Sequence, residues 1–160
     1  MDRNQVIRRV DAGWEAFRDS YSGLSVEKLL EPGPCGEWSV RDIIAHVTWW
    51  EEEALKHLPL ILKGGTPPRY SFVYGGIDAF NALMTERKKG LSLSEVLREQ
   101  ADTHRRLLKY LVTVPEAQLT GETRFRRRLR LDTYGHYKIH AQAIRKLREQ
   151  DEVAADTRRA

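Results

Sequence analysis

Residues 39–50, Ser-Val-Arg-Asp-Ile-Ile-Ala-His-Val-Thr-Trp-Trp, contain a helix start and a histidine on the apolar face of that helix. Ser39 is a typical N-cap residue, and Asp42 follows at the position that completes a capping box. Apolar residues then recur at three- and four-residue spacing, which predicts one apolar helix face. They are Val40, Ile43, Ile44, Val47, Trp50, Ala54 and Leu55. His46 lies on that face, so this helix is expected to bring an imidazole into the protein interior.

The rest of the chain divides into further amphipathic helices joined by connectors that contain Gly or Pro. The predicted helices cover residues 4–21, 39–63 with a kink or break near Pro59, 77–89, 94–114 with Ser94 as its cap, and 133–150 with Asp132 as its cap. A short turn contains Leu29 and Leu30, and residues 70–76 form a loop. No segment has the alternating pattern of strands. We therefore predict an all-α four-helix bundle with crossover connections, in one domain of residues 1–150 followed by a polar, frayed tail of residues 151–160.

Composition narrows the possible functions. The chain has 160 residues, of which 41% are hydrophobic, and a formal net charge of +4, which suits one folded domain. The single cysteine, Cys35, excludes an internal disulfide and sites built from several cysteines, and with no basic neighbour we expect an inert thiol. No signal peptide or long apolar run is visible, so we expect a soluble, cytoplasmic protein with no membrane partner.

The clearest chemical pattern is His136-Tyr137-Lys138-Ile139-His140. Two histidines four residues apart lie on the same helix face, where both imidazoles can reach one metal ion. Ala143 or Ile144, followed by Leu147, continues that face, so the pair is expected to point inward. His46 would supply a third ligand from another helix. Each histidine alone is better explained as a core or surface residue, but three inward imidazoles together need partners, and one divalent ion would satisfy all three.

A three-histidine site would leave a coordination position for water or substrate, which is typical of catalytic metal sites. Zinc and nickel are the metals that we expect most, although imidazole also binds copper and iron. The metalloprotease motif His-Glu-x-x-His is absent, because Tyr137 stands where that motif has its glutamate.

Five other polar residues have both a structural and a functional interpretation. Glu53 returns to the face of His46 and is the best candidate for a catalytic carboxylate, although a solvated position is favoured. Asp42 and Asp132 could each hold an imidazole in place, but both are good helix-start residues. His57 lies too far along its helix from His46 to share an ion, so a surface or helix-end role is expected. His104 has an open role, with a hydrogen-bonded core position favoured over a place in the site.

Two more features concern surfaces. Trp49 and Trp50 are adjacent, so we expect Trp50 to face the core or a pocket and Trp49 to lie at an edge or interface. Residues 124–130 hold five arginines, and we expect a solvated or interface loop there. Contact with an anionic substrate is an alternative, and nucleic-acid binding is the least favoured interpretation.

The segment from Gly36 to His46 resembles the second-helix signature of the DinB-like (YfiT-like) superfamily, and His136-x-x-x-His140 resembles the remaining ligand pair of that superfamily. The run from Arg128 to Tyr137 is similar to the ClbS/DfsB branch. The resemblance covers essentially the whole chain and implies a four-helix bundle, often dimeric, whose divalent metal is bound at positions that match His46, His136 and His140. Relatives include metal-dependent thiol S-transferases, a maleylpyruvate isomerase and resistance-type hydrolases.

Two functions remain open at this point. The first is a metal-dependent enzyme that hydrolyses a small molecule or transfers a thiol, with a small-molecule substrate or thiol as partner and a homodimer as its expected assembly. The alternative is a non-catalytic, resistance-type bundle that sequesters a ligand, with a structural metal or none. A nucleic-acid partner is not expected.

Overall fold

The computed structural model describes residues 1–33 and 36–160. Within these residues all regular secondary structure is helical apart from one isolated bridge residue. The helices are α1 (Arg3–Tyr21), α2 (Val26–Leu30), α3 (Val40–Leu62), α4 (Tyr70–Val73), α5 (Ile77–Lys88), α6 (Leu93–Thr113), α7 (Glu116–Thr120), α8 (Arg124–Asp132) and α9 (Tyr134–Arg159). The predicted all-α class is therefore confirmed. Cys35 lies outside the described residues.

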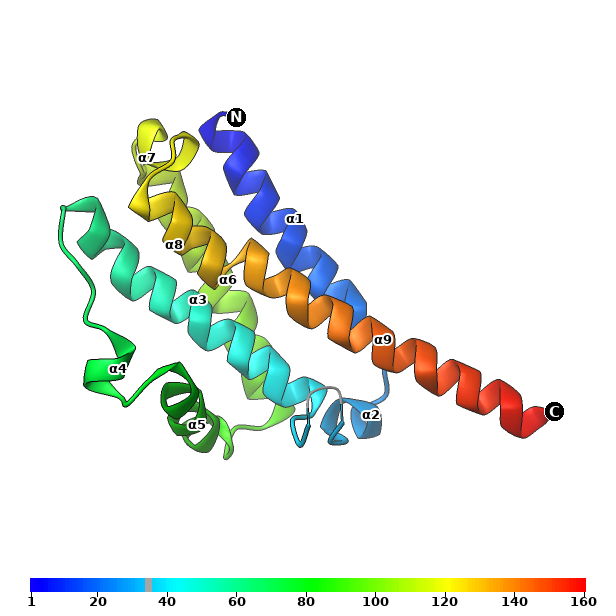
Figure 1. Cartoon of the computed structure of the whole chain (residues 1–160). Coiled ribbons are helices and arrows are strands. Elements are labelled where there is room, and N and C mark those ends of the chain that lie inside the picture. The colour runs from blue at the N-terminus through cyan, green and yellow to red at the C-terminus, as the bar shows by residue number, and fades with distance from the viewer. Residues whose placement is uncertain (34–35) are drawn as a thin grey trace.

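Four columns of helix form the bundle: α1, α3, α6, and the pair α8 and α9 that follow one another (Figure 1). Helices α3 and α6 run in the same direction, which requires the chain to return along the bundle between them. That return is the segment containing α4 and α5, which lies on one side of α3 (Figure 1). The predicted crossover connection is this segment.

Helix α3 is central, since it packs against α5, α6 and α8. Its start is the predicted capping box, in which the Ser39 hydroxyl accepts from the Asp42 N–H and the Asp42 carboxylate accepts from the Ser39 N–H. Pro59 lies inside α3, which continues to Leu62. Because three neighbouring helices cover it, α3 buries far more than one apolar stripe, including three of its charged residues, Arg41, Glu51 and Glu53.

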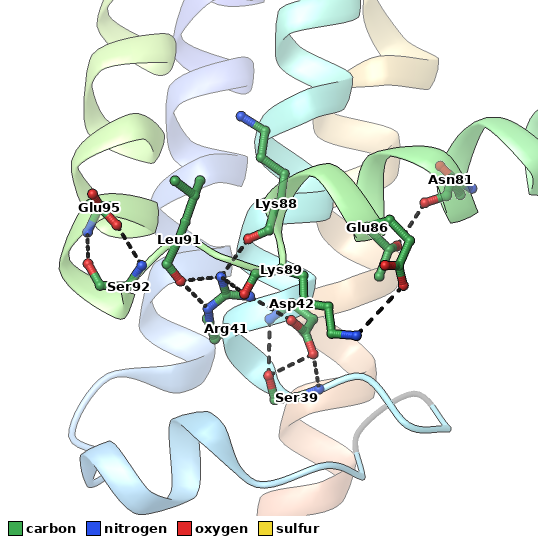
Figure 2. Close-up of polar contacts among 11 residues, drawn as sticks. Ser39, Arg41, Asp42, Asn81, Glu86, Lys88, Lys89, Leu91, Ser92 and Glu95 are labelled. Atoms are coloured by element: carbon green, nitrogen blue, oxygen red, sulfur yellow. Dashed lines mark hydrogen bonds and ion pairs between the residues drawn. The ribbon is translucent and has the colours of Figure 1, made fainter.

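Arg41 ties the beginning of α3 to the end of α5 (Figure 2). Its guanidinium donates to the backbone oxygens of Lys88, 2.7 Å away, and of Leu91, and it pairs with Asp42 at 2.8 Å. The last carbonyl groups of a helix lack partners within the helix. A cation near them also interacts favourably with the negative end of the helix dipole. Arg41 thus fixes the crossover helix α5 against α3.

Several predicted boundaries differ from the structure. The predicted loop of residues 70–76 contains α4, and Asp132, predicted to cap the last helix, is the last residue of α8. Three further differences concern helix starts and lengths. The cap of α6 is Ser92 rather than Ser94, and its side chain accepts from the Glu95 N–H. The arginine-rich segment expected as a loop is helix α8, capped by the hydroxyl of Thr123, which accepts from the Arg126 N–H. The last helix continues beyond Gln150 to Arg159, where a frayed end was expected. All three differences come from capping and helix propensity that the apolar pattern alone does not report.

The break between α8 and α9 positions the histidine pair. Thr133 leaves helical geometry, with φ −129° and ψ −109°, and its carbonyl accepts from the N–H groups of His136 and Tyr137, both at 2.8 Å. A Cβ atom on Gly135 would lie 2.8 Å from the carbonyl oxygen of Arg130, so glycine permits this close approach. His136 therefore lies in the first turn of α9, next to the end of α8.

Candidate metal centre

The structure brings His46, His136 and His140 together, with one ligand nitrogen of each lying within 4.8 Å of the others. The Nε2 atom of His136 is 2.9 Å from Nε2 of His46 and 3.0 Å from Nε2 of His140. His46 comes from the second turn of α3, whereas the other two come from successive turns of α9. All three Nε2 atoms face one another, so they surround a common point between the two helices.

The cluster is largely removed from water. Burial lowers the pKa of all three imidazoles, to about 2 for His46, about 3 for His136 and about 4 for His140, and neighbouring rings lower it further for His46 and His136. At neutral pH all three rings are therefore neutral. A neutral imidazole is the form that binds metal ions, so the site needs no deprotonation to act as a ligand set.

Hydrogen bonding within the protein does not satisfy these rings. A neutral ring nitrogen offers either one hydrogen or one lone pair, so Nε2 of His136 cannot bond to both of its neighbours at once. In the part of the chain that the structure describes, the buried Nδ1 atoms of His46 and His136 have no hydrogen-bond partner. A cation that accepts the lone pairs of all three Nε2 atoms fits this arrangement better than any set of hydrogen bonds among them.

A cavity of about 340 Å³ opens beside His46 and His136. Trp50, Ile77 and Leu131 form its apolar walls, and Tyr70, Asn81, Arg128 and Asp132 are the polar residues that line it. A cavity of this volume can hold a small molecule. Its position places any such molecule directly against two of the three clustered histidines.

Arg128 and Asp132 form an ion pair on the cavity wall. The Nε atom of Arg128 donates to the Asp132 carboxylate at 2.5 Å, and Nη2 donates to the Tyr70 hydroxyl at 2.8 Å. The guanidinium also lies over the Tyr70 ring, 5.7 Å from its centroid. Burial raises the pKa of Asp132 to about 6, although Arg128 opposes that shift. Asp132 was predicted to cap a helix, yet the structure makes it the carboxyl group nearest the cavity.

Glu53 lies one contact away from the cavity. Its Oε2 atom accepts from the Tyr70 hydroxyl at 2.8 Å and lies 2.9 Å from Nε2 of His57. The expectation of a solvated glutamate is corrected, because the side chain is buried. Glu53 holds Tyr70, and Tyr70 in turn holds Arg128. Helix α8 and the crossover segment thus meet at the Tyr70 hydroxyl, which this carboxylate holds.

Two further predictions about α3 are wrong for the same reason. His57 was expected in a surface or helix-end role but is buried beside Glu53, and Trp49 was expected at an edge or interface but is only 2% exposed. Trp49 and Trp50 both lie in the interior, because α5 covers a second face of α3. His104 has the core role that was favoured: its Nδ1 atom lies 3.2 Å from Glu51.

Sequence reasoning missed Tyr70 and Asn81 as cavity residues. Both lie in the crossover segment, which is far from the histidines along the chain. The spacing of neighbouring residues carries no signal for such contacts, because the path of the crossover decides which face of α3 it covers.

Among the described residues, no helix is long and apolar enough to span a membrane. Comparison with curated proteins gives no match. Two solved structures share the fold: "Sibling Lethal Factor Precursor - DfsB" has a TM-score of 0.77 and 17% identity, covering 94% of this chain and 97% of that one. The colibactin self-resistance protein ClbS, solved in complex with a dsDNA, has a TM-score of 0.77 and 16% identity, covering 92% and 95%.

The model of the DinB superfamily matches residues 9–143, which include all three clustered histidines and the crossover segment. The family model supports the predicted superfamily, and the DfsB and ClbS structures share the fold of this chain. From the match over most of its length, the chain belongs to the DinB superfamily.

Proposed function

We propose that the protein is a metal-dependent enzyme that acts on a small molecule, with His46, His136 and His140 as ligands of one zinc or nickel ion. The observation that carries the proposal is the cavity that opens directly onto His46 and His136. A closed structural site would have no such opening, and three protein ligands leave room for a reacting group. A divalent ion bound there supplies a Lewis acid and lowers the pKa of water or of a thiol.

Asp132 is the residue that would move the proton. It lies in the cavity wall, and its pKa of about 6 makes it ionised, but still a useful base, at neutral pH. It could accept the proton of a water O–H in hydrolysis or of a thiol S–H in thiol transfer. The carboxylate has no charge partner other than Arg128 within hydrogen-bond distance among the described residues. Glu53, the sequence-based candidate, would act through Tyr70 rather than on the substrate.

Arg128 would bind and orient the substrate. Its Nε and Nη2 groups already hold Asp132 and Tyr70, and its side chain lines the cavity. A guanidinium fixed at two points keeps its remaining N–H groups in a defined direction. The self-resistance role named for ClbS also favours a small-molecule substrate for this chain.

The dsDNA bound to ClbS makes nucleic acid the partner to test against this proposal. Two of the five arginines on α8 donate to backbone oxygens of the protein, Arg124 to Gly65 and Arg126 to Thr120, and a third, Arg128, lines the cavity. Phosphate binding depends on free cationic side chains. We therefore keep the small molecule as the substrate and expect no salt-dependent binding of a DNA duplex, which fluorescence anisotropy at low ionic strength will measure.

The function is tested by turnover of p-nitrophenyl esters, with and without a low-molecular-weight thiol, by zinc-loaded and chelator-treated protein. We expect turnover only when metal is bound, and a rate that rises with pH through about 6 as Asp132 ionises. Dependence on the thiol would identify transfer rather than hydrolysis. Asp132→Asn should lower the rate about 100-fold with unchanged metal content.

Asp156→Asn is the matched control, because Asp156 is exposed on the distal part of α9. It should leave both rate and metal content unchanged. Equal rates for zinc-loaded and chelator-treated protein would contradict the enzymatic proposal. Equal effects of the two aspartate substitutions would remove Asp132 from it.

A further inference from the structure

Two adjacent tryptophans converge on one oxygen atom of the cavity wall. The indole N–H of Trp50 donates to Oδ1 of Asn81 at 3.1 Å, and the indole N–H of Trp49 donates to the same atom at 3.3 Å. Asn81 is on α5 and lines the cavity beside His46 and His136. Neither of the two hydrogen bonds is needed to form α3, yet both buried indole groups are used for this contact.

The double contact determines the orientation of the Asn81 amide. An indole N–H is a donor only, so the atom that faces both indoles must be the carbonyl oxygen and not the nitrogen. The amide nitrogen, Nδ2, therefore points away from the tryptophans and carries two hydrogens. Among residues 1–33 and 36–160, Nδ2 has no hydrogen-bond partner. The buried polar atoms of these residues that lack a partner do not include it, so Nδ2 is not enclosed by the protein. Asn81 thus brings a donor that has no partner among the described residues to the set of residues that line the cavity.

The helix that carries Asn81 is held in place from its other end. Arg41 binds the carbonyl oxygens of Lys88 and Leu91 at the end of α5, and Figure 2 shows this contact and Asn81 on the same helix. Phe80, the neighbour of Asn81, is 1% exposed and packs against Trp50 with ring centroids 5.3 Å apart. The donor is therefore presented by a fixed helix rather than by a mobile loop.

The rest of the cavity indicates what this donor would bind. Arg128 is a second donor among the lining residues, and the largest remaining walls are the apolar side chains of Trp50, Ile77 and Leu131. Two donors and an apolar pocket suit a molecule that carries an oxygen acceptor on an apolar body.

We propose that Asn81 is a specificity-determining residue that donates a hydrogen bond to a carbonyl oxygen of the substrate, so that the cavity selects apolar carbonyl compounds. The inference rests on the proposed function in so far as the bound molecule is called a substrate. Recognition of a carbonyl oxygen by Asn81 needs only the cavity. Asn81 then contributes binding and orientation, and Asp132 and the histidines contribute the chemistry.

The chain has two asparagines, Asn4 and Asn81, which makes a direct spectroscopic test possible. Protein labelled with ¹⁵N-asparagine gives two pairs of side-chain NH₂ signals in a ¹H–¹⁵N spectrum, and Asn81→Asp assigns them. The probe is phenylacetamide, an apolar ring with a neutral carbonyl acceptor, titrated at millimolar concentration into zinc-loaded and into metal-free protein. We expect the Asn81 pair to shift while the Asn4 pair remains in place.

Asn81→Asp keeps the oxygen that the two indoles require and removes the NH₂ donor. We expect it to weaken phenylacetamide binding about tenfold, the effect of one lost hydrogen bond in a desolvated pocket. Asn4→Asp makes the same chemical change at an exposed position on α1 and should not alter the affinity. The indole signals of Trp49 and Trp50 report whether the Asn81→Asp variant keeps its fold.

The results separate the two proposals. The role of Asn81 is overturned if phenylacetamide shifts the Trp50 indole signal but not the Asn81 NH₂ signals. It is also overturned if phenylacetamide shifts neither signal in zinc-loaded protein. Failure to bind either zinc or nickel overturns the metal-dependent function. In that case a shift of the Asn81 pair in metal-free protein still supports carbonyl recognition, and its absence overturns that as well.

Discussion

Two buried histidine environments in this bundle differ in what their ring nitrogens contact. His104 is 3% exposed, and its two nitrogens lie 3.2 Å from Glu51 and 3.1 Å from Asp11. Its ring stacks on Trp14 at 4.0 Å with an interplanar angle of 1°. In the cluster of His46, His136 and His140, by contrast, the short contacts of the ring nitrogens are to one another.

The difference teaches that burial alone does not identify a metal ligand. Both environments withdraw imidazoles from water, His46 and His104 fully and His136 and His140 in part, and the buried polar atoms of both need partners. Around His104 the protein supplies carboxylates and an aromatic face, so the ring is already satisfied. Around the cluster the protein supplies further imidazoles, which compete for the same hydrogens. We infer that the first environment serves the fold and the second serves a ligand.

The largest effect should come from His136→Ala. His136 makes both of the short Nε2 contacts, so its removal leaves His46 and His140 on different helices without the central ligand. We expect zinc affinity to fall about 1,000-fold or more, which corresponds to about 4 kcal/mol. Bound metal per chain, measured by mass spectrometry after dialysis, and titration calorimetry will give the change.

His104→Ala is the matched control for that substitution. It should leave zinc affinity unchanged and lower the free energy of unfolding by about 3 kcal/mol, because Glu51 would stay buried without its imidazole partner. Urea unfolding followed by tryptophan fluorescence measures this loss. If the two variants lost metal to the same extent, the distinction between the environments would be wrong.

The sequence predicted the cluster because its members follow local rules. His136 and His140 have the i,i+4 spacing of one helix face, and His46 sits within an apolar repeat that follows a capping box. The all-α bundle and its crossover also followed from periodicity and from the Gly and Pro connectors. These features depend on residues close together in the chain, where spacing determines direction.

The predictions failed where the neighbours of a helix decide the outcome. A single apolar face was assumed for α3, but α5, α6 and α8 cover it on several sides. Trp49, Glu53 and His57 are buried for that reason. The contact of both tryptophans with Asn81 depends on where the crossover returns, which no local pattern specifies. For α8, the cap residue Thr123 was the available signal, but the density of arginines suggested a loop.

A smaller effect is expected from acid, which should lower the unfolding free energy of the metal-free protein through the histidine cluster. In metal-free protein the pKa of His140 is lowered by burial from 6.5 to about 4, so the unfolded chain takes up its proton first as the pH falls below 6.5. The native state therefore loses stability between pH 6.5 and about 4. At pH 5 this amounts to about 2 kcal/mol for one imidazole, from 1.5 pH units at about 1.4 kcal/mol each.

Buried carboxyl groups with raised pKa values, such as Asp132, act in the opposite direction, so the comparison needs a matched variant. Metal-free His140→Asn keeps those carboxyl groups and removes one imidazole. Its unfolding free energy should depend on pH less steeply than that of the unmodified protein, by about 1.4 kcal/mol per pH unit between pH 6.5 and 5. Equal slopes would show that His140 titrates as it does in the unfolded chain.

The smallest effect is expected at Tyr137, which is close to the histidine cluster in the sequence but contacts the environment of His104 in the structure. Tyr137 lies between His136 and His140 on α9, yet its hydroxyl donates to Glu51 at 2.6 Å, so it belongs with His104. Tyr137→Phe should therefore cost about 1 kcal/mol of unfolding free energy, the typical value of one hydrogen bond, and leave zinc affinity unchanged. The same urea and calorimetric measurements apply. A loss of zinc affinity larger than the loss of stability would mean that Glu51 and Tyr137 help to position the histidine pair, and the two environments would then be one coupled site.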